Sequence, residues 1–109
     1  MDNSSQLSAK TEYVYLLRSG KSFLVKIGFT REHPGIRLKS LQTGNPEQLI
    51  LVDYLAVLDG LQLETRLHET YHLSRTNGEW FDFSDERTRE HFQKCWKRLK
   101  DSFTVPLFD

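Results

Sequence analysis

The feature that most constrains the fold is a series of short apolar runs separated by turn-forming residues. Two strand-like runs, residues 11–17 and 23–29, flank the tract Ser19-Gly20-Lys21-Ser22, which suits a hairpin turn. A third run covers residues 48–57 and follows Gly44-Asn45-Pro46, a strong break in any preceding helix. The first half of the chain is therefore predicted to supply short strands.

Helix signals lie between and after these runs. Pro34 fits the first turn of a helix that reaches about residue 42. Asp59 and Gln62 form a capping box for a helix over residues 60–73. Residues 80–83 are short, aromatic and extended, and Ser84 is the expected cap of a final helix. Its core face is predicted from the spacing of Phe92, Cys95, Trp96 and Leu99. This order predicts an α+β fold in which helices flank a small sheet.

Length and charge set further limits. The 109 residues suit one domain over residues 11–103, after a polar disordered leader at 1–10 and before a C-terminal tail at 104–109. Fifteen basic and fifteen acidic residues cancel, so nucleic-acid binding would need a local basic patch. The single cysteine, Cys95, excludes an internal disulfide and fits a reducing cytoplasm. No signal peptide or membrane-spanning run is visible, so a cytoplasmic protein without membrane contact is predicted.

Glu64 is the acid whose position needs an explanation. On a helical wheel, Leu63, Leu67 and Tyr71 form an apolar stripe, and Glu64 falls about 20° from Tyr71, whereas Glu69 falls roughly 160° away. Glu64 is therefore predicted to point inward, where an ionised carboxylate is costly unless a cation or hydrogen bonds meet it. Two interpretations remain open, an ion pair with a nearby Arg or Lys and a ligand for a divalent metal.

The segment from His68 to His72 also matches the zinc-protease signature H-E-x-x-H. A zinc site would need a third ligand, and only Glu90 or His91 lies close downstream. It would also need Glu69 to face the metal, although the wheel places Glu69 toward solvent. The zinc reading is therefore disfavoured, His72 is predicted to face solvent, and His91 is predicted on the partly exposed side of the last helix.

The first hairpin carries a second unusual feature. Tyr13 and Tyr15 share one face of the first strand, and Lys26 interrupts the apolar second strand. A two-residue turn at Gly20-Lys21 would place Tyr15 directly opposite Lys26. Gly28 then suggests a close approach of another group to the backbone. With Arg37 on the next helix and Glu64 on another, four polar groups are predicted to converge, although each alone suits an ordinary strand or surface residue.

Five strings in order resemble the motifs of the GIY-YIG nuclease superfamily. The strings are YVY at 13–15, KIG at 26–28, RLKSLQTGNP at 37–46, LETRLH at 63–68 and GEWF at 78–81. The likeness is nearest to a phage-type branch in which KIG replaces YIG and GEWF closes the site. It covers roughly residues 11–83 and implies a central three-stranded antiparallel sheet flanked by helices, with a magnesium-dependent phosphodiesterase site.

The resemblance implies a role for each matching residue. Tyr15 matches the tyrosine that helps to activate the attacking water, and Arg37 matches the arginine that holds the scissile phosphate. Glu64 matches the carboxylate that binds a single divalent ion, Mg²⁺ or Mn²⁺. Glu79 stands where many members carry asparagine, and it is expected to play a supporting part. His68, one turn beyond Glu64, is expected to support the metal ligand.

Lys26 departs from the family pattern because it replaces the second tyrosine. A cation beside Tyr15 would favour a phenolate or hold a phosphate oxygen, so Lys26 is included among the catalytic candidates, with Tyr13 and Gly28 in support. The expected activity is hydrolysis of DNA phosphodiester bonds. Two alternatives stay open, a nucleic-acid-binding module that does not cut and a protein-interaction domain with a vestigial site. Assembly as a homodimer or with a protein partner also stays open.

Overall fold

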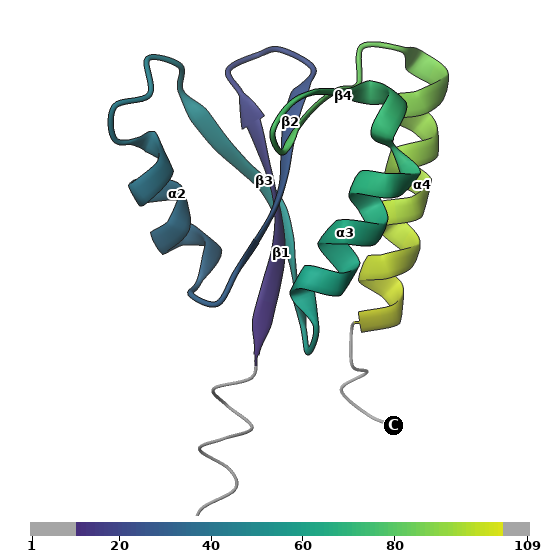
Figure 1. Ribbon diagram of the computed structural model, residues 1–109, viewed down its shortest axis with the longest axis horizontal. Coiled ribbons are helices and arrows are strands. Elements are labelled where there is room, and N and C mark those ends of the chain that lie inside the picture. Colours follow the sequence, from purple (N-terminus) through teal and green to yellow (C-terminus); the bar gives the residue numbers. More distant parts are fainter. Residues whose placement is uncertain (1–10, 104–109) are drawn as a thin grey trace, which may run out of the picture.

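The computed structural model describes residues 11–103 and shows a five-stranded sheet between helices. The predicted leader and C-terminal tail lie outside the described residues. The sheet order is β3-β1-β2-β5-β4, with α2 on one face and α3 and α4 on the other (Figure 1). The strands are β1 (Glu12–Ser19), β2 (Leu24–Thr30), β3 (Leu49–Val57), β4 (Arg75–Asn77) and β5 (Trp80–Asp82). The helices are α2 (Pro34–Gln42), α3 (Gly60–Thr70), the 3₁₀ turn η1 (His72–Ser74) and α4 (Glu86–Phe103).

The prediction of a three-stranded sheet was wrong in strand number. The α+β class and the antiparallel pairing are confirmed, but β4 and β5 add two strands at the edge next to β2. Both are only three residues long, and β4 is entirely exposed. Because β4 is polar and buries no face, it carries none of the alternation from which a strand is predicted.

The register of the first hairpin also differs from the prediction. The loop has four residues, 20–23, rather than two, and Gly20 adopts φ 55° while the Ser22 amide donates to the Ser19 carbonyl at 3.1 Å. As a result Tyr15 lies opposite Gly28, and Lys26 lies opposite Leu17. The shift is by two residues, so every side chain keeps its predicted face of the sheet. Lys26 therefore remains on the same face as Tyr15.

Alternation along β1 divides the core into two parts. Val14 and Leu16 face α3 and α4, where the larger apolar cluster continues to Phe81, Phe92 and Trp96. The intervening side chains face α2, where Tyr15, Leu17 and Leu49 form a smaller buried cluster. β1 lies between β3 and β2 and is buried on both faces, which makes it a rigid support for any side chain it carries.

Side chains fix where the helices begin. His33 caps α2 because its Nδ1 accepts from the Gly35 amide at 3.0 Å. Asp59 caps α3 by accepting from the Gln62 amide at 3.1 Å, as the capping box predicted. Glu12 of β1 adds a second acceptor at this helix start, for the Gly60 amide at 2.8 Å.

Two predicted helix limits were wrong. α3 ends at Thr70, and His72 begins a 3₁₀ turn instead of continuing the helix to residue 73. α4 begins at Glu86, and its first turn is capped by Asp85, whose carboxylate accepts from the amide and hydroxyl of Thr88. Ser84 was the expected cap, but Asp85 caps the helix instead, because its carboxylate accepts both of these hydrogen bonds.

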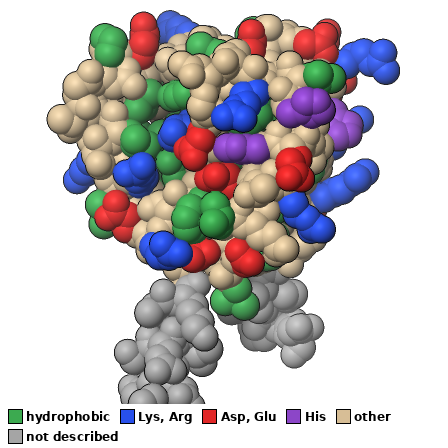
Figure 2. All heavy atoms as spheres, in the orientation of Figure 1, with side chains coloured by type: hydrophobic (Ala, Val, Ile, Leu, Met, Phe, Trp, Pro, Cys, Tyr) green, Lys and Arg blue, Asp and Glu red, His purple; other side chains and the backbone are tan. Residues whose placement is uncertain are grey.

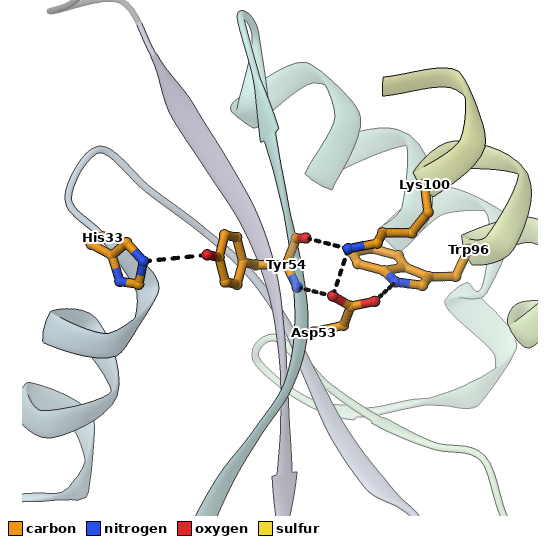
Figure 3. A network of polar contacts seen from close by, with 5 residues as sticks. All are labelled: His33, Asp53, Tyr54, Trp96 and Lys100. Carbon is orange, nitrogen blue, oxygen red and sulfur yellow. Dashed lines mark hydrogen bonds and ion pairs between the residues drawn. The ribbon is translucent and has the colours of Figure 1, made fainter. Parts of the chain in front are cut away.

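A polar network connects the two faces of the sheet through β3 (Figure 3). Asp53 accepts from the Trp96 indole and from Lys100, both at 2.9 Å. The next residue, Tyr54, points to the opposite face and its hydroxyl lies 3.3 Å from His33 Nε2. α4 and the start of α2 are thereby tied to neighbouring residues of one strand. Within residues 11–103 no helix is both long and apolar enough to cross a membrane.

Candidate functional site

Tyr15 is the centre of the candidate site. It lies midway along β1 with 1% of its surface exposed, and it packs into the smaller core beside Leu17 and Trp80. Its strand partner is Gly28, where an added Cβ would overlap the phenol ring. The glycine is thus required by the close approach of the tyrosine, as the sequence suggested.

Charged groups from three other elements surround the Tyr15 phenol. Burial raises its pKa, a hydrogen bond from Arg37 of α2 opposes the increase, and the negative charges of Glu79 and Glu64 add to it. Arg37 lies in the first turn of α2, whose start is fixed by the His33 cap. The structure therefore brings together four residues from separate segments. They are Tyr15 of β1, Arg37 of α2, Glu64 of α3 and Glu79 of the turn between β4 and β5.

Lys26 and Glu79 form an ion pair at the edge of this group. Lys26 Nζ lies 2.8 Å from Glu79 Oε1, and the lysine side chain is only 14% exposed. The pairing of β2 with β5 positions both residues, because Lys26 lies opposite Trp80 and the Glu79 carbonyl accepts from the Ile27 amide at 3.0 Å. Glu79 was predicted to play a supporting part, and here it is the direct partner of Lys26.

Glu64 lies on the inner side of α3, as the wheel predicted, and is 7% exposed. Its pKa is raised to about 7, first by burial and then by the charge of Glu79, while the charge of Lys26 opposes the increase. Within residues 11–103 no hydrogen bond offsets the burial of this carboxylate. A buried acid with an acidic neighbour suits a divalent cation, because hard cations prefer carboxylate oxygens.

His68 fixes the position of α3 against the sheet. Its Nε2 lies 2.8 Å from the carbonyl oxygen of Ile27 in β2, and its ring contacts Phe81. Because the imidazole nitrogen must donate to a carbonyl, the bond sets which ring nitrogen carries the proton. Glu64 precedes His68 by one helical turn, so this bond helps to hold the carboxylate close enough to Tyr15 to affect the pKa of the phenol.

Tyr13 lies outside the acidic group. Its ring contacts the rings of His33 and Tyr54, with centroid separations of 5.9 Å in both cases. Tyr13 lies on the same face of the sheet as Tyr15 and contacts His33 at the start of α2. No signal in the sequence indicated a role for His33 at the start of α2, because histidine is not among the usual helix caps.

The zinc-protease arrangement is absent. His68 bonds the Ile27 carbonyl, whereas His72 turns back and its Nδ1 lies 2.9 Å from the Glu69 carbonyl. Glu69 is exposed, as predicted, and His91 lies 2.8 Å from the Tyr71 hydroxyl. Among the described residues, no group of three or more His, Cys, Asp or Glu side chains could hold a metal ion. Any metal here would therefore need ligands beyond the protein, such as water and phosphate oxygens.

The surface over this region mixes charges of both signs. Acidic, basic and histidine side chains lie close together on the middle of the face, between α2 and α3 (Figure 2). A phenol, a guanidinium, an ammonium and two carboxylates at one position can hold an anionic group on one side and a cation on the other. Such a pairing is suited to binding a phosphate ester together with a divalent ion.

The chain is a small α+β domain in which polar side chains from several elements meet beside Tyr15. The chain belongs to the T5orf172 domain family, whose pattern it matches over residues 12–100. This domain occurs in phage and bacterial nuclease-like proteins. Comparisons with curated proteins and with solved structures found no match.

Proposed function

We propose that this chain is a GIY-YIG-type endonuclease that hydrolyses DNA phosphodiester bonds with the help of one divalent metal ion. The observation that carries the proposal is the meeting of Tyr15, Arg37 and Glu64 at one point, from β1, α2 and α3. Each of these residues also stands at a matching position of the motifs that the sequence shares with that superfamily. Membership of the T5orf172 family supports a nucleic-acid substrate.

The phenol of Tyr15 positions the attacking water in this proposal. Burial raises its pKa, so the phenol is protonated at neutral pH and acts by hydrogen bonding rather than as a strong base. Arg37 lies close enough to the phenol to lower its pKa, and its guanidinium has N–H groups with which to hold two oxygens of a phosphate. The guanidinium then stabilises the charge that develops on the phosphoryl oxygens during the reaction.

Glu64 is the residue that would hold the metal ion. Its burial, its raised pKa and its lack of a hydrogen bond within residues 11–103 all favour exchange of its proton for a divalent cation. Glu79 faces the same point and would add negative charge there. When bound, Mg²⁺ or Mn²⁺ would supply stabilisation of the leaving oxygen.

Lys26 occupies the place of the family's second tyrosine. Its ion pair with Glu79 holds the ammonium beside Glu64. In the proposed reaction the ammonium contacts a phosphate oxygen as a point charge. A positive charge here also lowers the cost of gathering two carboxylates and a scissile phosphate around one point.

Nicking of supercoiled plasmid in Mg²⁺ or Mn²⁺ tests the proposal. The wild-type chain should cut, and Glu64→Gln should lower the rate by a factor of about 100 or more, as expected for loss of a group that acts on the transition state. Glu69→Gln is the matched control, since Glu69 is an exposed acid on the same helix. A wild-type chain that does not cut, or equal losses in the two variants, would contradict the proposal.

A second candidate is a nucleic-acid-binding module that does not cut. The observation that favours it is the 2.8 Å Lys26–Glu79 ion pair, which takes the place of a phenol and neutralises one carboxylate of the site. Under this alternative Arg37→Gln weakens DNA binding, while no condition gives cleavage. The same plasmid assay, run beside a binding titration, separates the two functions.

A further inference from the structure

A second surface feature lies on the face of the sheet opposite Tyr15. A hollow of about 630 Å³ opens between the β1–β2 loop and α4, and we refer to it as the hairpin groove. Its volume lies within the range of about 300–1,000 Å³ that is usual for ligand sites. Its floor is apolar and largely aromatic, formed chiefly by Leu16, Val25, Phe83, Phe92 and Trp96.

The rim of the groove is basic although the whole chain is neutral. Five cations line it, and two acids accompany them. Both acids already face cations, Asp53 with Lys100 at 2.9 Å (Figure 3) and Asp101 with Lys97 at 3.8 Å. Arg18 and Lys21 form no ion pair with a carboxylate in the described part of the chain. The local excess of positive charge is therefore available to an anionic ligand.

A stacked pair of side chains forms one wall of the groove. The Arg89 guanidinium lies 4.4 Å from the ring centroid of Phe23, and its Nη1 donates to the carbonyls of Phe83 and Ser84 at 2.9 and 3.1 Å. These bonds hold the guanidinium in place across the loop between β5 and α4. Phe23 is nevertheless 49% exposed, so much of its ring is available for contact.

We infer that the hairpin groove binds single-stranded nucleic acid, separately from the proposed catalytic site. Phosphates lie against the basic rim and a base stacks on the exposed ring of Phe23, which is the combination that single-strand binding surfaces use. The bases of a duplex are stacked and paired and cannot stack on such a ring. Charge complementarity selects a polyanion, and the exposed Phe23 ring selects one that carries flat rings. The inference does not depend on cleavage.

The test is fluorescence anisotropy with a labelled twelve-residue oligothymidine, in EDTA so that no cutting occurs. Lys21→Gln combined with Lys97→Gln removes two exposed rim charges. We expect affinity to fall by about fivefold or more, and the slope of log K against log salt to fall by about 0.7 for each lost phosphate contact. Phe23→Ala should also weaken binding by about fivefold, the lower end of the effect of losing one base stack.

The matched control is Lys94→Gln combined with Arg98→Gln. Both are exposed cations of α4, neither lines the groove, and the change in net charge is the same. Their affinity should stay within about twofold of wild type, since only the general field of the protein changes. Equal losses in the two pairs, or no loss from Phe23→Ala, would overturn the inference. Competition by a polyglutamate peptide as effective as that by the oligonucleotide would also overturn it. If the wild-type chain fails to nick plasmid, that result refutes the proposed catalytic function and leaves the inference about the hairpin groove unchanged.

Discussion

Glu64 should make the domain less stable as its carboxylate ionises. Its pKa is raised from 4.5 to about 7 in the folded chain, so folding favours the protonated acid. The stability that this group contributes is fully present below pH 4.5 and is lost as the pH rises to about 7. One pKa unit corresponds to 1.36 kcal/mol, so the full loss is about 3 kcal/mol. With 7% exposure, solvent screens little of it.

Urea unfolding of wild type and Glu64→Gln between pH 4.5 and 8 measures this effect. Glutamine resembles the protonated acid, so the two chains should be similar at the low end, and the variant should gain about 3 kcal/mol in relative stability by pH 7 and no more above it. Groups that titrate alike in both chains cancel in the difference. Glu69→Gln, on the exposed side of the same helix, should give a flat difference. A flat difference for Glu64→Gln would refute the reasoning about its burial.

Three further predictions concern the surroundings of the site. Gly28→Ala should destabilise the fold by about 1–3 kcal/mol in urea unfolding, because the new Cβ meets the Tyr15 ring, and unchanged stability would contradict that contact. Burial raises the pKa of Asp53, but hydrogen bonds from Trp96 and Lys100 outweigh this and hold it below its usual value. Asp53→Asn should therefore lower stability at pH 7 by about 1 kcal/mol, and the loss should fade as the pH falls below 4, whereas a constant loss would argue against the ion pair. Cys95 packs against the larger core, so a thiol reagent should label it far more slowly in the native than in the unfolded protein, and equal rates would contradict its structural role.

Much of the fold could be predicted because its strongest signals are local. The α2 bounds, the start of α3 and the inward position of Glu64 all follow from helical spacing and caps. The register of the first hairpin could not be predicted, because it depends on whether the loop has two or four residues, and both Gly20-Lys21 and Ser22 suit a turn. The predicted face of the sheet for each side chain was still correct, because the register shifted by an even number of residues.

The parts of the site that escaped prediction depend on contacts between distant segments. Sequence spacing brought Tyr15, Lys26, Arg37 and Glu64 together as candidates, and the structure places them together. The Lys26–Glu79 ion pair requires β5, a three-residue strand whose pairing has no period to reveal it. The His68 bond to the Ile27 carbonyl likewise joins residues 41 positions apart.

The most direct test of the central claim is a double-mutant cycle on DNA cleavage. Single-turnover rates would be measured in Mg²⁺ for wild type, Tyr15→Phe, Glu64→Gln and the double variant. If Tyr15 and Glu64 act on one phosphodiester as a unit, the double variant should be about as slow as the slower single variant, because groups that act together give strongly non-additive losses. Independent multiplication of the two losses, or full activity in either single variant, would contradict the claim that these residues form one catalytic site.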